Sequence, residues 1–161
     1  MIKKIPKNTS CFTYFNANPK DKRSSDCVVR AISYASGISW DSVLDDLVVF
    51  AHKYKEMPSD AKCFSKYLEY IGFEKKKQPR KMDNTKYTGK EFCELLNKKY
   101  KDSKCGFSYD IVANIGGHHI VAIRLDSDNK YKVFDIWDCT DKTIGNYWVC
   151  DSKMYHKGEG L

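Results

Sequence analysis

The sequence predicts an α+β fold, with helices in the N-terminal part of the chain and an antiparallel sheet in the C-terminal part. Two observations predict this division. Before residue 100, apolar residues recur at steps of three and four, as on a helix with one buried face. After Cys105 they alternate, as on a strand. At 161 residues the chain fits one domain, 1–161, in which we expect 1–10 and 152–161 to be loosely ordered.

Four helices are predicted, each from an apolar stripe and a boundary signal. They cover 24–35, 39 to about 52, and 60–71, and a fourth begins at 88. Gly37 ends the first helix, and residues 24–26 offer N-cap side chains at its start. Thr88 and Glu91 have the spacing of a capping box, so the fourth helix is expected to begin there.

Four strands are predicted in the second part of the chain. They are centred on residues 107–113, 119–123, 131–135 and 147–149. Residues 126–130, Asp-Ser-Asp-Asn-Lys, form a hairpin turn between the middle two. Because strands joined by short turns pair in opposite directions, the sheet is expected to be antiparallel.

The cysteine content and the start of the chain argue against export and against membrane insertion. The seven cysteines are an odd number, and the basic residues near the N-terminus are not followed by an apolar segment. No stretch approaches the length of a bilayer-spanning helix. We therefore expect reduced thiols, no membrane partner and a cytoplasmic location.

Positive charge is concentrated in the segment Lys75–Lys81, where five of seven residues are basic in a chain of net charge +7. Such a segment could meet phosphates or an acidic protein, but a solvated lysine-rich loop is the simpler interpretation. No nucleic-acid motif accompanies the segment and no aromatic residues are interleaved with it, so we expect no nucleic-acid partner.

Cys27 is the candidate nucleophile. It is the only one of the seven cysteines at the predicted start of a helix preceded by a polar loop. A helix N-terminus and a neighbouring imidazolium both stabilise a thiolate, which is the reactive form of a cysteine. The position of Cys27 therefore predicts an activated thiol.

A histidine base and a carboxylate to orient it are expected from the predicted sheet. His119 opens the strand 119–123 after two glycines, and alternation places His118 on the opposite face. Asp135 ends the next strand, across the hairpin, and can accept the second imidazole N–H. Asp138 remains a close rival three residues later, as His118 does for the histidine.

The residue spacing favours neither a metal nor a cofactor. Four histidines and seven cysteines are present, but no Cys-x-x-Cys pair or other recognised ligand spacing occurs. The Gly116-Gly117 pair lacks the Lys-Ser/Thr sequence and the helix start of a phosphate loop. We therefore expect no metal and no cofactor.

Three local matches resemble the papain-like cysteine peptidase superfamily. Residues 25–32, Ser-Asp-Cys-Val-Val-Arg-Ala-Ile, resemble its nucleophile helix, with the Asp-Cys start of the bacteriocin-leader-processing branch. Residues 117–122, Gly-His-His-Ile-Val-Ala, resemble its histidine strand. Residues 135–137, Asp-Ile-Trp, resemble the Asn-Ser-Trp segment of papain, in which the amide orients the histidine and the tryptophan shields that contact from water.

The resemblance implies a papain-like fold and a triad of Cys27, His119 and Asp135, with Asp in place of the family's Asn. It makes Trp137 a candidate shield of the His–Asp contact, with core packing as the alternative. The chain departs from the family in having no glutamine upstream of the cysteine to form the oxyanion hole.

Asn18 or Asn16 could supply the missing amide donor, although both also suit the turn before Pro19. On this resemblance we expect a cysteine peptidase, isopeptidase or related thiol amidohydrolase or acyltransferase that acts on a protein or peptide. The chain also resembles small phage and prophage proteins that share an Asp-Cys-Val-Arg-Ala-like helix. The alternative is therefore a non-catalytic papain-fold binding protein, such as a phage-encoded inhibitor of an acidic host protein, located in the host cytoplasm.

Overall fold

The computed structural model describes residues 4–102 and 108–152. Its helices are α1 (Cys27–Ser36), α2 (Trp40–Tyr54), α3 (Ala61–Tyr70) and α4 (Gly89–Asp102). Its strands are β1 (Phe12–Tyr14), β2 (Glu74–Lys76), β3 (Tyr109–Ile115), β4 (His119–Leu125), β5 (Tyr131–Asp135) and β6 (Ile144–Asp151). The fold is α+β, as predicted. The loose order expected at the two ends falls, for 1–3 and 153–161, outside the described residues.

The strands form one mixed sheet in the order β1-β5-β4-β3-β6-β2. Most neighbouring strands are antiparallel, but β1 runs parallel to β5, with Tyr14 beside Asp135. The prediction of an antiparallel sheet is therefore wrong at this edge. A parallel pair needs a long connection, and the chain between β1 and β5 contains all four helices. With three residues each, β1 and β2 are too short to show the alternation that identifies a strand.

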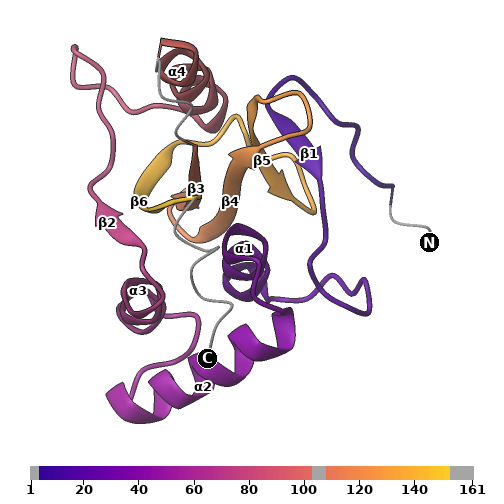
Figure 1. The fold of residues 1–161 in the computed structure, drawn as a ribbon, viewed down its shortest axis with the longest axis vertical. Helices are drawn as coiled ribbons and strands as arrows, with labels where there is room; N and C mark the ends of the chain where they lie inside the picture. The colour runs from indigo at the N-terminus through magenta and orange to yellow at the C-terminus, as the bar shows by residue number, and fades with distance from the viewer. Residues whose placement is uncertain (1–3, 103–107, 153–161) are drawn as a thin grey trace.

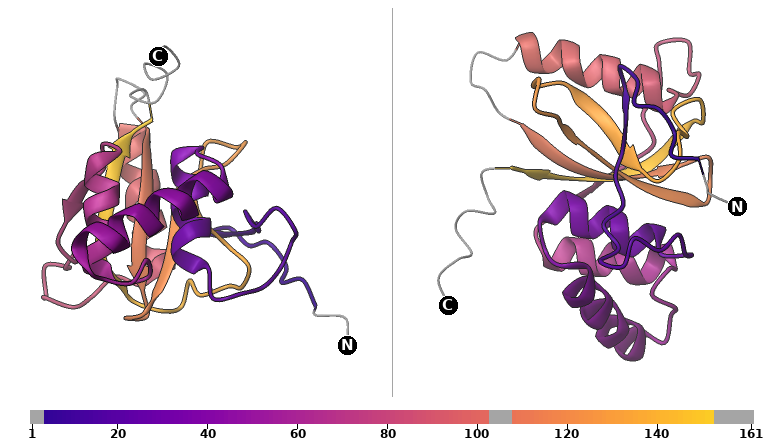
Figure 2. Two further views of the ribbon diagram at one scale, coloured as in Figure 1. Left: turned by 90° about the horizontal axis from the view of Figure 1, so that it is seen from below. Right: turned by 90° about the vertical axis from the view of Figure 1, so that its right-hand side faces the viewer.

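Helices cover both faces of the sheet, as Figures 1 and 2 show. One face packs against α1, α2 and α3, and the other against α4. Strand β4 serves both faces, because Ile120 and Ala122 lie in the first apolar cluster and Val121 and Ile123 lie in the second. This explains why the segment after His119 is continuously apolar. No helix in the described part of the chain has the length and apolar content needed to cross a bilayer.

Two of the predicted helix ends have the expected capping contacts, and the third has its N-cap residue where predicted but lacks the capping bond. Gly37 adopts the left-handed conformation, with φ of 74°, and its N–H donates to Ser33, so α1 ends there. Thr88 and Glu91 form the capping box: each backbone N–H donates to the other's side chain, at 2.9 and 3.2 Å. Asp26 stands at the N-cap of α1, but its carboxylate makes no capping bond.

Two turns place the histidine and the aspartate at neighbouring strand ends. Gly116 and Gly117 both have positive φ, 63° and 90°, which glycine adopts without steric cost, and they turn the chain so that β4 begins at His119. The predicted hairpin between β4 and β5 is confirmed, with the Asp126 N–H donating to the Lys130 carbonyl at 2.9 Å. The candidate base and its orienting carboxylate therefore come from adjacent strands.

The basic segment Lys75–Lys81 is not wholly a loop, which corrects the simpler interpretation of its sequence. Its first two lysines belong to β2, which pairs with β6. Lys75 lies over the ring of Trp148, 5.7 Å from the ring centroid. Lys81 forms an ion pair of 2.6 Å with Glu91. Part of this positive charge is thus already engaged within the fold.

Candidate active site

Three element ends meet at one place in the fold. Cys27 is the first residue of α1, His119 the first of β4 and Asp135 the last of β5. The imidazole hydrogen-bonds to the carboxylate, and it is close enough to the thiol to lower the thiol pKa. These are the three residues that the sequence selects as a candidate triad.

The imidazole of His119 is held through its Nε2 atom by Oδ2 of Asp135. Asp135 is only 4% exposed, so water competes little for this contact. The ring is thus oriented between a buried carboxylate and a partly buried thiol, which is the arrangement that lets an imidazole exchange a proton with a nucleophile.

The surroundings of His119 favour the imidazolium form. Burial alone lowers the pKa of this imidazole, but the hydrogen bonds and negative charges of Asp135 and Cys27 outweigh burial. Together they raise the pKa from 6.5 to about 9. At neutral pH the ring therefore carries a positive charge beside the sulfur.

The surroundings of Cys27 favour the thiolate. Burial raises the pKa of the thiol, but the His119 hydrogen bond, a backbone hydrogen bond from Ile120 and the charges of His119 and Arg30 lower it below the ordinary value. Three other cysteines have a raised thiol pKa, in each case mainly because of burial: Cys63, Cys93 and Cys139. Cys27 is thus set apart from these three thiols by its charged neighbours.

A buried arginine, which the sequence analysis does not single out, joins this cluster. Arg30 lies one helical turn after Cys27 and donates from Nη2 to Oδ1 of Asp135 at 3.2 Å. Its Nη1 pairs with Oδ1 of Asp26, and Arg30 is only 5% exposed. A signal for it was present, because Asp26 and Arg30 are four residues apart on a helix whose neighbouring positions are apolar.

The second oxygen of the Asp26 carboxylate anchors the start of α1 to its surroundings. This Oδ2 atom accepts hydrogen bonds from Trp40 Nε1 of α2 at 2.9 Å and from Asn18 Nδ2 at 3.0 Å. Asp26 is 8% exposed. The Asp26 carboxylate, expected as a helix cap, is therefore buried and joins α1, α2 and the preceding loop through its hydrogen bonds.

The two candidate oxyanion donors make turn contacts instead. Asn16 donates both amide hydrogens within the loop before α1, and its oxygen accepts from the Asn18 N–H. Asn18 donates to Asp26, and its oxygen accepts from the Lys20 N–H. The turn interpretation that the sequence left open describes these contacts, and neither asparagine has a hydrogen bond to Cys27 among the described residues.

Trp137 lies against the imidazole, and the two rival residues lie outside the cluster. The ring centroids of Trp137 and His119 are 5.1 Å apart, and Trp137 is 42% exposed, so it covers the imidazole without being a core residue. The Asp138 carboxylate instead accepts from the N–H and hydroxyl of Thr140, at 3.0 and 2.6 Å. His118 is exposed in the turn before β4.

A buried thiol places one possible metal-binding group at the same site. Ligand atoms of His119, Asp135 and Cys139 lie within 4.8 Å of one another. However, the two oxygens of Asp135 already contact the imidazole and the Arg30 guanidinium, so a cation would meet a positive charge. The contacts therefore favour an ion-pair network over a metal centre.

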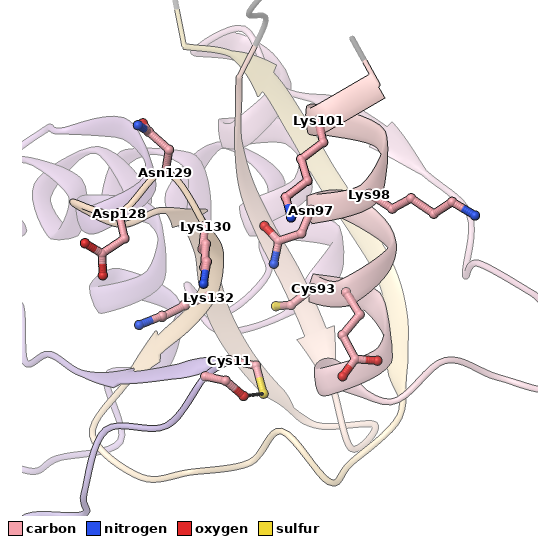
Figure 3. A pocket seen from close by; sticks show the side chains of 11 residues that line it. Cys11, Cys93, Asn97, Lys98, Lys101, Asp128, Asn129, Lys130 and Lys132 are labelled. Carbon is pink, nitrogen blue, oxygen red and sulfur yellow. Dashed lines mark hydrogen bonds between the residues drawn. The ribbon is translucent and has the colours of Figure 1, made fainter.

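Two cavities differ in their relation to the triad. A cavity of about 350 Å³ lies beside the start of α1 and is lined by residues on both sides of Cys27 in sequence: Ser24, Ser25, Asp26, Val28, Val29, Trp40, Leu44, Pro58 and Ser59. The other, of about 480 Å³, lies between α4 and the β4–β5 hairpin and has no triad residue in its lining (Figure 3). Its lysines do not converge, because Lys98 points away and Lys132 pairs with Asp126.

Comparisons of the chain with protein-family models, with curated proteins and with solved structures found no match. What the site can do must therefore follow from its own geometry and charges.

Proposed function

We propose that the protein is a papain-like cysteine peptidase, isopeptidase or related thiol acyltransferase. The observation that carries this proposal is the position of His119 between the Cys27 thiol, whose pKa it lowers, and the buried Asp135 carboxylate, to which it hydrogen-bonds. The pKa of the thiol is lowered while that of the imidazole is raised, so both shifts favour the thiolate–imidazolium pair. A thiolate paired with an imidazolium at a helix start is a nucleophile ready for attack.

In the proposed reaction the Cys27 thiolate attacks the carbonyl carbon of an amide and forms a tetrahedral intermediate. The C–N bond then breaks while His119 gives its proton to the leaving amine, and the acyl group remains on sulfur as a thioester. Water, deprotonated by His119, releases the acyl group as a carboxylic acid and restores the thiol. If an amine enters instead of water, the same steps transfer the acyl group.

The backbone N–H of Cys27 is our candidate oxyanion donor. The first N–H groups of a helix lack intrahelical acceptors, and α1 has no side-chain cap. A donor of this kind contributes about 2.7–4 kcal/mol to transition-state stabilisation. The site thus has one candidate oxyanion donor, although the amide side chains of Asn16 and Asn18 are engaged in other contacts.

The cavity beside the start of α1 suggests a substrate feature. It combines the apolar side chains of Val28, Val29 and Leu44 with exposed serines at its edge. We propose that it receives an apolar side chain of a protein or peptide next to the scissile amide.

The pH dependence of Cys27 alkylation tests this proposal. Because Cys27 is more exposed than the other described cysteines, faster labelling alone would only report accessibility. We would therefore measure its peptide-mapped iodoacetamide rate from pH 4 to 9 in the wild type, in His119→Ala and in the matched control His118→Ala. The proposal predicts that the pH midpoint of Cys27 alkylation lies well below the ordinary thiol pKa of about 8.5 in the wild type and in the control. In His119→Ala the midpoint should lie at about 8.5.

A wild-type midpoint near 8.5 would contradict the catalytic proposal and favour the alternative, a papain-fold protein that binds an acidic partner without turnover. The observation that favours this alternative is that both candidate amide donors, Asn16 and Asn18, are held in turn contacts. A low midpoint would justify screening peptide and isopeptide substrates, with Cys27→Ala as the inactive reference.

A further inference from the structure

We propose that Arg30 is a positioning residue, which holds Asp135 against His119 and ties β5 to the helix that carries Cys27. This inference rests on the proposed function, since positioning has meaning only if the thiol and the imidazole react. It assigns a role to a side chain that touches neither the sulfur nor a substrate. Its basis is the way one guanidinium is shared between two buried carboxylates.

The guanidinium spans two parts of the chain that are far apart in sequence. Nη1 pairs with Asp26, one residue before Cys27, and Nη2 donates to Asp135, which is 105 residues from Arg30 along the chain. Asp26 is fixed in turn by Trp40 of α2. Arg30 therefore connects an anchored helix start to the end of β5, where the orienting carboxylate stands.

The geometry leaves one polar atom without a partner. The Nε atom of Arg30 is buried and has no hydrogen-bond partner among the described residues. An arginine that met a single carboxylate side-on could use Nε and Nη2 together. Here the side chain instead gives one terminal nitrogen to each carboxylate and leaves Nε unpaired, which has a free-energy cost. Arg30 thus bridges the two carboxylates although its Nε atom forgoes a hydrogen bond.

The charges in this network favour the reactive form of the pair. Asp26 and Asp135 contribute two negative charges and Arg30 one positive charge, so the buried group carries a net negative charge. A protonated His119 balances that charge, and low solvent exposure makes the attraction strong. Without the guanidinium, Oδ1 of Asp135 would lose its hydrogen-bond donor, and the carboxylate could turn away from the imidazole.

A purely structural ion pair would behave differently from a positioning residue. Arg30 is itself a positive charge that lowers the Cys27 pKa, so a change in the thiol titration alone would not identify positioning. If only that charge is lost, the His119 pKa rises, because a nearby positive charge disfavours the imidazolium. If Asp135 also moves away from the imidazole, the His119 pKa falls, because the hydrogen bond and charge of Asp135 raise it. The direction of the change in the His119 pKa therefore separates the two roles.

The experiment compares Arg30→Gln, Arg30→Lys and a matched control, Arg124→Gln. Arg124 also pairs with a buried aspartate, Asp110, at 2.6 Å, and it lies toward the other end of β4 from His119. For each folded variant we would measure the imidazole pKa of His119 by NMR and the pH midpoint of Cys27 alkylation. We expect Arg30→Gln to lower the His119 pKa and to reduce labelling at pH 6 at least tenfold, with Arg30→Lys between it and the wild type.

Arg124→Gln should change neither the His119 pKa nor the pH midpoint of Cys27 alkylation, even where it lowers the stability of the protein. A folded Arg30→Gln protein in which the His119 pKa is unchanged or raised would overturn this inference and leave the proposed function intact. A different result is also possible: Cys27 could titrate with an ordinary thiol pKa while Arg30→Gln still lowers the His119 pKa. That result would contradict the proposed function but support the role of Arg30 in holding Asp135. If Arg30→Gln does not fold, Arg30→Lys takes its place, because lysine keeps the charge but cannot give one nitrogen to each carboxylate. A His119 pKa below the wild-type value then supports the inference, and an unchanged or raised pKa overturns it.

Discussion

Asp135 contacts His119 diagonally across two strands. The β4–β5 ladder pairs Ala122 with Phe134, so Asp135 continues beside Val121, two residues along β4 from His119. Diagonal neighbours on one face of an antiparallel pair are within reach of longer side chains. A slip of one residue in this register would place the imidazole and the carboxylate on opposite faces. The site therefore depends on the register that the hairpin between β4 and β5 maintains.

The charge of Asp135, and not only its hydrogen bond, should govern the thiol. Asp135→Asn keeps an acceptor for the imidazole but removes the negative charge beside it. We expect iodoacetamide labelling of Cys27 at pH 6 to fall about tenfold, equivalent to about 1.4 kcal/mol. Asp138→Asn is the control, because the Asp138 carboxylate contacts Thr140 instead of the imidazole. Equal losses in the two variants would argue against Asp135 as the orienting group.

The contribution of His119 to stability should decrease as the pH rises. Its pKa is about 9 in the folded protein, above its ordinary 6.5. A raised pKa stabilises the fold fully below pH 6.5, and this stabilisation is lost as the pH rises through 9. We would measure urea unfolding of Cys27→Ala with and without His119→Asn. The Cys27→Ala background removes the thiolate, whose lowered pKa has the opposite pH dependence.

In that background we expect the His119→Asn variant to lose stability on the order of 1–3 kcal/mol at pH 6 and less at pH 9. The hydrogen bond and charge of Asp135 raise the imidazole pKa independently of the thiol, so we expect the same direction of the trend in this background. A loss that grows with pH would show that His119 is not held as an imidazolium.

Trp137 should protect the reactive pair without stabilising the fold. Its ring covers His119 while 42% of its surface stays exposed. We expect Trp137→Ala to slow Cys27 labelling at pH 6 by about 2- to 10-fold, which corresponds to the 0.5–1.5 kcal/mol of an aromatic contact. Trp137→Phe should retain most of the wild-type rate. A large fall in the thermal midpoint of Trp137→Ala would instead indicate a packing role.

The short parallel strand β1 should matter for stability. Phe12 is fully buried at this edge of the sheet, next to Val133 of β5. We expect Phe12→Ala to reduce the free energy of unfolding by about 3–5 kcal/mol in urea titrations. Phe15, just after β1, is 38% exposed, so Phe15→Ala should cost clearly less. Similar losses in the two variants would mean that β1 is not part of the cooperative core.

Local patterns in the sequence determined the helices, the main strands and several of their ends. Gly37, Thr88 and Glu91 act through neighbours one turn away, so their boundaries could be predicted from a few adjacent residues. The start of α1 at Cys27 follows from the same kind of local signal. Cys27, His119 and Asp135 could be selected together because each stands at the end of an element that such patterns predict.

Only the tertiary structure decided how these elements pair and which side chains become buried. The parallel pairing of β1, the burial of Asp26 and the exposure of Trp137 have no local signature, because each depends on which surfaces meet after the helices pack on the sheet. Arg30 is the clearest case. Its four-residue spacing from Asp26 is a local signal, but its second partner is 105 residues away, and a contact of that range exists only once the chain has folded.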